Sequence, residues 1–255
     1  VDVEFAELES SLASEAKEAS SSGGKSGWAA LAEPRFRKLL ALVVSLQALQ
    51  QLSGINAVVY YTPQTLKAVG VPMLFQRFGF GDNSASLLAT MLAYVPKIPS
   101  LLLTMFLMDR MGRRRLLQTF VPIMALCHFG LAGAFSFMGD SLAWPRLLAM
   151  ASICTYGSAF SFSLGPIPNI LTAELFPMRA RAAAMSTSLG AQFIFNTLVG
   201  LGFPILRHQL GAQKVFMGFG FVCVATWLFV NKFVFETKGK SLEQLSAGKP
   251  DARTE

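Results

Sequence analysis

Charged residues are scarce in this sequence. Only 15% of its 255 residues are Asp, Glu, Lys or Arg, whereas 53% are hydrophobic. Ordinary soluble domains carry about 25% charged residues and interleave them with apolar positions at helical period. Here the charges gather in short clusters between long apolar runs. This pattern argues against a soluble core and favours a chain embedded in a membrane.

Histidine and cysteine are scarce as well. The chain has two His and three Cys, and Cys127, Cys154 and Cys223 fall in separate apolar runs without metal-ligand spacing. The sequence also lacks a nucleophile with its base, or a pair of carboxylates, in a reacting arrangement. We therefore expect no metal, no cofactor and no enzymatic activity, and we assign the lone His128 no role.

Five long runs contain no charged residue, and a sixth contains only Lys97. Their lengths are close to the roughly 20 residues that a bilayer requires. Because hydrocarbon offers the backbone no water, such runs must be helices, and membrane strands would be about half as long. We predict an all-α membrane protein whose bundle, residues 34–235, has six transmembrane helices, at about 39–61, 84–108, 116–138, 147–173, 182–206 and 213–233.

The segments between these spans hold Lys and Arg unequally. One side of the membrane receives twelve: Arg35, Arg37, Lys38, Arg110, Arg113, Arg114, Arg115, Arg179, Arg181, Lys232, Lys238 and Lys240. The other receives five: Lys67, Arg77, Arg146, Arg207 and Lys214. The richer side, which holds both termini, is predicted to be cytosolic. The net charge of +7 then reflects anionic lipid beside the helix ends, not nucleic-acid binding.

The two ends of the chain are polar. Residues 1–33 are rich in Ser, Gly and acidic side chains, and they lack the charged-then-apolar plan of a signal peptide. We predict a disordered cytosolic linker there, with an amphipathic stretch starting at Trp28, and a cytosolic tail over residues 236–255. A chain that opens in such a linker is expected to be part of a longer protein.

The first span carries a group of neutral polar side chains. Gln47, Gln50 and Gln51 share one helical face, and Asn56 and Tyr60 follow a Ser-Gly pair at which the helix can loosen. Such groups are costly in lipid, so they should face protein or a water-filled cavity. Amides offer both donors and acceptors, which suits a ligand made of hydroxyls. The simpler alternative is that they only hold neighbouring helices together.

Four segments resemble, in order, motifs of the sugar porter family of the major facilitator superfamily. QQLSGIN with the following Tyr60-Tyr61 is similar to the signature of the family's seventh helix. DRMGRRR resembles its conserved cytosolic loop, GPIPNILTAELFPMRAR its tenth-helix motif, and FETKGKSLEQL its carboxy-terminal motif. The order implies that the six spans are helices seven to twelve, the carboxy-terminal half, whose partner is a missing amino-terminal half of six helices.

The resemblance also implies which side chains line the sugar site. They are Gln50, Gln51, Asn56, Tyr60, Asn169, Gln192 and Asn196. Asn169 stands where many members have Trp, and in this it resembles plant monosaccharide transporters of the vacuolar membrane. Gln192 and Asn196 are spaced four residues apart and share a helix face, although helix packing alone could account for one of them.

Gly165, Pro166 and Pro168 predict a break in the fourth span, because two prolines remove two amide donors from the helix. Broken helices are where transporters place binding sites and hinges. The alternative is that the prolines only shape the packing.

Charged residues at the cytosolic helix ends resemble the family's charge network, which holds the two halves together on that side and acts as a two-state switch. They are Asp109, Arg113, Arg114, Glu174, Arg181 and Glu236. Simple anchoring at the membrane surface would explain the arginines but not the carboxylates.

Lys97 lies twelve residues before Asp109, about 18 Å along a helix and so near the bilayer centre. From there its amine cannot reach the interface cheaply. We hypothesise that Lys97 faces a water-filled cavity and either binds the sugar or pairs with a carboxylate of the missing half.

The function that the resemblance implies is transport of a monosaccharide, a hexose, by alternating access in the vacuolar or plasma membrane. We expect proton coupling, with the proton-binding Asp in the missing half. Two alternatives stay open: a sugar sensor that does not transport, and a structural scaffold or incomplete fragment.

Overall fold

The computed structural model describes residues 27–76, 79, 81–137 and 143–238. Over these residues the fold is all-α, with six stretches long and apolar enough to cross a membrane. They are Pro34–Val69, Asn83–Met111, Arg113–Ser136, Trp144–Leu175, Met178–Leu210 and Ala212–Phe233. Each overlaps one of the spans predicted from the charge-free runs. The predicted third span ends at residue 138, which lies outside the described residues.

Three of the six spans consist of two helices each. The helices are α3 (Pro34–Leu52) with α4 (Ile55–Val69), α6 (Asp82–Tyr94) with α7 (Lys97–Met111), α8 (Arg113–Ser136), α9 (Trp144–Phe162) with α10 (Ile167–Leu175), α11 (Met178–Leu210) and α12 (Ala212–Phe233). A short helix, α5 (Met73–Gln76), precedes α6. The first, second and fourth spans are therefore interrupted within the membrane.

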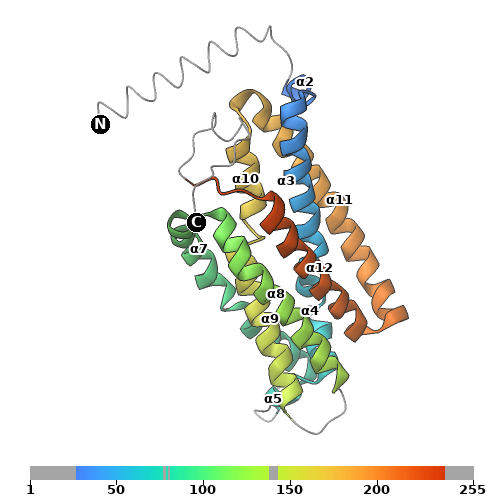
Figure 1. Cartoon of the computed structure of the whole chain (residues 1–255). Helices are drawn as coiled ribbons and strands as arrows, with labels where there is room; N and C mark the ends of the chain where they lie inside the picture. The colour runs from blue at the N-terminus through green and yellow to red at the C-terminus, as the bar shows by residue number, and fades with distance from the viewer. Residues whose placement is uncertain (1–26, 77–78, 80, 138–142, 239–255) are drawn as a thin grey trace.

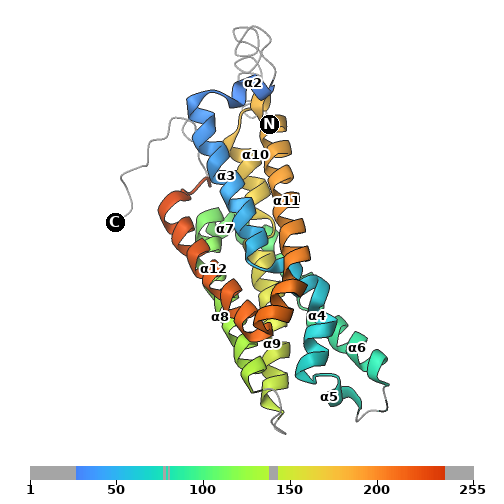
Figure 2. The same cartoon turned by 90° about the vertical axis from the view of Figure 1, so that its right-hand side faces the viewer.

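The spans run side by side along one long axis (Figures 1 and 2). In both views α2 (Gly27–Leu31) and α10 lie at one end and α5 at the other. Helix α8 packs against both α12 and α9, and α3 packs along α11. The positions of α10 and α4, which continue α9 and α3, put the breaks of these spans inside the bundle.

The last part of the predicted linker, where an amphipathic stretch was expected from Trp28, forms the helix α2 (Gly27–Leu31), which packs on the start of α11. The contact is close: a Cβ on Gly27 would lie 2.7 Å from the Arg179 carbonyl oxygen, so glycine suits this approach. Residues 1–26 of the predicted linker and 239–255 of the predicted tail lie outside the described residues.

Burial differs strongly between spans. Large side chains such as Phe36, Leu46, Met124 and Phe216 are fully buried in the core. In the most apolar stretch of the second span only 17% of the residues are buried, and in that of α11 only 11%. Ile98, Phe106 and Leu201 are among the exposed side chains. Apolar surface on this scale is typical of contact with lipid or with a second helical bundle.

Candidate functional site

The first span breaks at Ser53 and Gly54. Gly54 has φ +86°, a left-handed conformation that costs a residue with a Cβ about 1–2 kcal/mol. A Cβ there would also lie 2.8 Å from the Phe219 ring. The Ser53 hydroxyl donates to the Gln50 carbonyl at 2.7 Å, which closes the end of α3. Ser53 and Gly54 therefore end α3, and a new helix, α4, begins at Ile55.

The backbone carbonyl of Ser53 is bound by side chains from three other helices. It accepts from His128 Nε2 of α8 at 2.8 Å and from the Tyr156 hydroxyl of α9 at 3.1 Å. The Cys223 thiol of α12 adds a weaker contact at 4.0 Å. All three side chains are buried. These donors replace the helical partner that the break removed.

The fourth span breaks between Phe162, where α9 ends, and Ile167, where α10 begins. This is the Gly165-Pro166-Ile167-Pro168 segment in which the prolines predicted a break. The Gly165 amide donates back to the Phe160 carbonyl at 2.8 Å, but Leu164 and Gly165 present carbonyls that no helical amide satisfies.

Those two carbonyls are bound by the first span. Gln50 Nε2 donates to the Leu164 carbonyl at 2.5 Å and to the Gly165 carbonyl at 3.1 Å. The break in α9–α10 is thus capped by a side chain 114 residues away, three residues before the break in α3–α4.

A line of amides continues from Gln50. Gln51 Nε2 donates to Gln50 Oε1 at 3.2 Å, and Asn56 Nδ2 donates to Gln51 Oε1 at 2.5 Å. We call Gln50, Gln51 and Asn56 the amide network. All three side chains are buried, and they join both breaks. Beside them, Gln47 Nε2 donates to Asn169 Oδ1 at 2.7 Å.

Two buried amide oxygens on α3 and α11 have no partner among the described residues. They are Gln47 Oε1 on α3 and Gln192 Oε1 on α11, the helix that packs along α3. An unpaired buried acceptor costs about 1–3 kcal/mol, so each calls for a donor such as a hydroxyl or water. Both are suited to receive a ligand's hydroxyl hydrogens.

The other candidate residues of α4 and α11 are less enclosed. Tyr60 is 54% exposed and approaches Gly200 of α11, where a Cβ would lie 3.9 Å from its ring. Tyr61, not Tyr60, is anchored: its hydroxyl donates to the Gly200 carbonyl at 3.3 Å. Asn196, one turn before Gly200, is half-buried. The structure thus brings Tyr60 and Asn196 to one helix pair but not into the amide network.

Lys97 is the first residue of α7, immediately after the break in the second span. Its Nζ lies 5.8 Å from the centre of the Tyr94 ring, a distance at which a cation is attracted to the π face. The Tyr94 hydroxyl hydrogen-bonds the Thr62 hydroxyl of α4 at 2.9 Å. Lys97 is therefore connected to the helix that carries Asn56 and Tyr60.

At the end of the bundle predicted to be cytosolic, carboxylates join three elements. Arg113 of α8 forms an ion pair with Glu174 of α10 at 2.7 Å. Glu236, just after α12, accepts from the backbone amides of Arg113 and Arg114 at 2.9 and 3.1 Å, which caps the first turn of α8. Thr237 donates to the other Glu174 oxygen at 2.7 Å. We call Arg113, Glu174 and Glu236 the carboxylate cluster.

Two of the charges predicted for this network lie apart from it. Asp109 is exposed and forms no ion pair within the described part of the chain. Arg181 bonds the Phe176 carbonyl at 3.1 Å rather than a carboxylate. Arg114 contributes its backbone amide, while its guanidinium bonds the Asn231 carbonyl at 2.9 Å.

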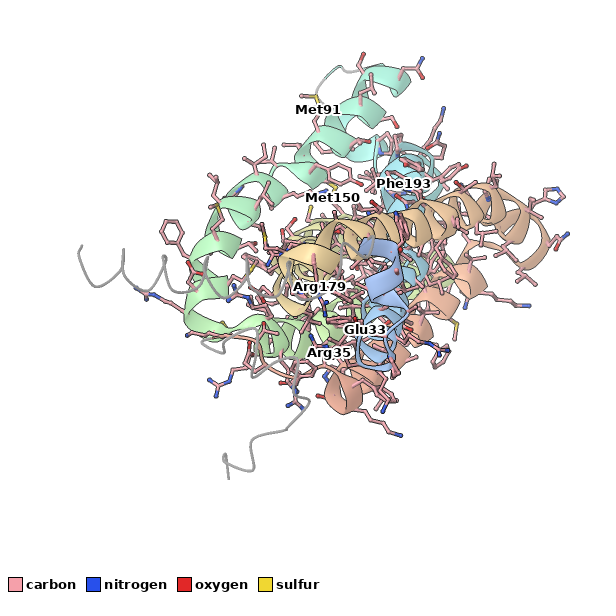
Figure 3. The ribbon with its side chains drawn as sticks, turned by 90° about the horizontal axis from the view of Figure 1, so that it is seen from above. Glu33, Arg35, Met91, Met150, Arg179 and Phe193 are labelled. Carbon is pink, nitrogen blue, oxygen red and sulfur yellow. The ribbon has the colours of Figure 1, made fainter. Side chains whose placement is uncertain are left out.

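An ion pair outside the predicted network holds the start of the bundle. Arg179 of α11 lies 3.4 Å from Glu33, and Figure 3 shows the two side chains together with Arg35. Both arginines lie over the Phe36 ring, at 5.7 and 4.4 Å from its centre. Glu33 stands next to Pro34 at the start of α3, so a carboxylate before the first span was the available signal.

Comparison with known proteins agrees with the sequence motifs. Residues 1–248 match the family described as "Sugar (and other) transporter". Monosaccharide-sensing protein 2 of Arabidopsis thaliana is 36% identical over 219 residues, which cover 86% of this chain and 30% of that protein. Plastidic glucose transporter 4 of the same plant is 34% identical over 225 residues, covering 88% of this chain and 39% of that protein. The chain thus spans about a third of these relatives' length.

Solved structures give the same answer for the fold. The proton:xylose symporter XylE, bound to 6-bromo-6-deoxy-D-glucose, superposes with a TM-score of 0.67 at 30% identity. The match covers 82% of this chain and 42% of XylE. An inward open form of XylE from E. coli gives a TM-score of 0.68. The six-span bundle, its two joined breaks and these matches together establish that the chain belongs to the sugar porter family of the major facilitator superfamily.

Proposed function

We propose that this chain forms one side of the pathway of a membrane transporter for a monosaccharide, a hexose or a close derivative of one. The observation that carries the proposal is the amide network, which lies where two interrupted spans meet. Transporters of this superfamily bind substrate at such interruptions near the membrane midplane.

The amide network is suited to a ring of hydroxyls. Gln50 is a positioning residue, because both hydrogens of its amide are engaged by the Leu164 and Gly165 carbonyls. Gln51 keeps one amide hydrogen and Asn56 keeps its carbonyl oxygen for the ligand. Gln47 Oε1 and Gln192 Oε1 add two acceptors. Tyr60, Asn169 and Asn196 complete the proposed binding set.

Alternating access is the proposed mode of action. In it, this bundle and the six-helix bundle expected upstream rock about the midplane site. The carboxylate cluster lies at the end of the bundle that carries α2 and α10. Its bonds would hold α8, α10 and the segment after α12 as one rigid unit during rocking, while Asp109 and Arg181 are available to the other bundle.

Proton coupling is proposed by analogy with XylE, which is named as a proton:xylose symporter. The carboxylates whose side chains the structure describes, Glu33, Asp109, Glu174 and Glu236, all lie at span ends. A coupling carboxylate would therefore come from the upstream half. The proposed location is the vacuolar or plasma membrane, with both termini cytosolic.

The test is uptake of labelled hexose by the full-length parent in a cell without hexose transporters. Wild type and Gln51→Ala are compared at two pH values, with the amount of protein in the membrane measured for each. We expect wild-type uptake that Gln51→Ala lowers at least tenfold, and higher uptake at the lower pH. Uptake by wild type and Gln51→Ala at the same rate would refute the proposed site.

A sugar sensor is the second candidate, favoured by the names of three relatives, monosaccharide-sensing proteins 1, 2 and 3 of Arabidopsis thaliana. A sensor would bind hexose through the amide network without flux. Binding of labelled hexose to the purified parent, measured beside uptake, separates the two. A scaffold would show neither binding nor flux.

A further inference from the structure

Lys97 occupies the middle of a membrane span. It is the fifteenth of the 29 residues of Asn83–Met111, about 20 Å from either end at 1.5 Å per residue. Its side chain is half-buried in this bundle. A lysine at this depth is costly unless it faces water or a partner charge.

The local structure offers little to offset that cost. Lys97 begins α7, where the Ile98 amide donates to the Val95 carbonyl and the Ser100 amide donates to the Pro96 carbonyl. The Tyr94 ring offers only a weak π contact at 5.8 Å. Fold stability therefore does not account for a cation here.

None of the carboxylates whose side chains the structure describes forms an ion pair with Lys97. The three ion pairs among the described residues, Arg35–Glu33, Arg113–Glu174 and Arg179–Glu33, all lie at span ends. A partner charge for Lys97 would have to come either from the opposing bundle or from the substrate.

A fixed carboxylate on the opposing bundle fits the proposed mechanism poorly. It would join the two bundles across the position that the sugar occupies. Each transport cycle would then separate a desolvated ion pair, at a cost of about 3–5 kcal/mol. A carboxylate on the substrate arrives and leaves with the sugar, so the pair is broken only when water replaces the substrate.

We propose that the preferred substrate is a monosaccharide with one carboxylate, such as a hexuronate, and that Lys97 binds this carboxylate. The inference rests on the proposed transport function and deepens it. Amides of the amide network bind the hydroxyls, and the Lys97 ammonium forms a charge-assisted hydrogen bond to the acid group. A sugar phosphate, with a charge of about −1.5 to −2, would leave negative charge uncompensated by one lysine.

The helix geometry places the two subsites at a similar depth in the bundle. Tyr94 is level with Thr62 through their hydrogen bond. Thr62 lies six residues beyond Asn56, about 9 Å along α4, and Lys97 lies three residues back from Tyr94 in the antiparallel span, about 4.5 Å. About 4.5 Å of height then separates Lys97 from Asn56.

The test is competition for transport by the full-length parent in proteoliposomes. Labelled glucuronate uptake is measured against unlabelled glucuronate, its methyl ester and glucose, for wild type, Lys97→Met, Lys97→Gln and Lys97→Arg. The methyl ester is the matched probe, because it keeps the shape and removes the charge. Two neutral variants, Lys97→Met and Lys97→Gln, are used in case one of them fails to fold. The size-exclusion elution of all four proteins checks that each is folded.

We expect wild type to favour glucuronate over its methyl ester at least tenfold, Lys97→Arg to keep that preference, and both neutral variants to lose it. A wild type that transports glucose but ignores glucuronate overturns this inference and leaves the proposed function standing. Equal preference in wild type and Lys97→Met overturns it too. No uptake of any sugar by correctly inserted wild type overturns both.

Discussion

The three interrupted spans differ in how their breaks are held. The Ser53 carbonyl at the first break is bound by α8, α9 and α12, and the carbonyls of the fourth span's break are bound by Gln50. The break of the second span is capped within its own helix: the Ser100 hydroxyl and amide both donate to the Pro96 carbonyl.

The breaks therefore differ in how far their hydrogen bonds depend on other helices. The first and fourth breaks share one set of hydrogen bonds, so neither can bend alone without leaving buried groups unpaired. The second span needs no other helix to satisfy its break, and little of it is buried. We infer that the breaks of α3–α4 and α9–α10 bend together, whereas the break of α6–α7 can bend without disturbing their shared hydrogen bonds.

The largest effect is expected at Gly54. Gly54→Ala forces a Cβ into left-handed backbone and against the Phe219 ring at 2.8 Å, so we expect a loss of about 3–5 kcal/mol of stability and no transport. Thermal unfolding of the full-length parent in detergent measures it. Gly218→Ala in α12 is the control, since a Cβ there meets nothing within 4 Å. Equal stability of the two variants would contradict a fixed first break.

The next effect concerns the bond between the two breaks. Gln50→Met keeps the side-chain length but removes the donor to the Leu164 and Gly165 carbonyls, at an expected cost of about 2–4 kcal/mol. The control is Gln64→Met on an exposed position of α4. The measurement is again the unfolding temperature. If the two substitutions lower it equally, Gln50 does not hold the fourth span.

A smaller effect is expected at the Ser53 carbonyl, because three donors share it. His128→Leu and Tyr156→Phe should each cost about 1–2 kcal/mol, and the double variant should cost more than their sum, since only the weak Cys223 donor remains. A double-mutant cycle on thermal stability measures the coupling. Strict additivity would show that the two donors act independently.

The smallest effect is expected at Ser100. Ser100→Ala removes one donor to the Pro96 carbonyl but leaves the backbone amide of the same residue, so we expect a change below about 0.5 kcal/mol. Unfolding temperature and hexose uptake both test it. A loss as large as that of Gln50→Met would erase the distinction between the two kinds of break.

The spans could be predicted from the sequence because the bilayer imposes their length and excludes charge. The fold class is confirmed over the described residues, as is the family. An amphipathic stretch was predicted from Trp28, but its packing on α11 could not be predicted, since it brings Gly27 against the Arg179 carbonyl, a contact between residues 152 positions apart (179 − 27).

The candidate site could be predicted only in part from the sequence. The amides of the first span were visible because polar groups are rare in lipid, but their partners were not. Gln50 donates to two carbonyls of the fourth span, and His128, to which we assigned no role from the sequence, holds the first break. Both facts depend on which helices pack together, which composition does not encode. The roles of the remaining site residues stay predictions.

The central claim is that the amide network binds the sugar's hydroxyls. Its most direct test is a double-mutant cycle between the sugar and Gln51. Dissociation constants are measured for glucose and each of its monodeoxy analogues, with the full-length parent as wild type and as Gln51→Ala. We expect one hydroxyl whose removal weakens binding to wild type about tenfold and binding to Gln51→Ala hardly at all. If every deoxy analogue loses affinity by the same factor in both proteins, Gln51 does not contact the sugar.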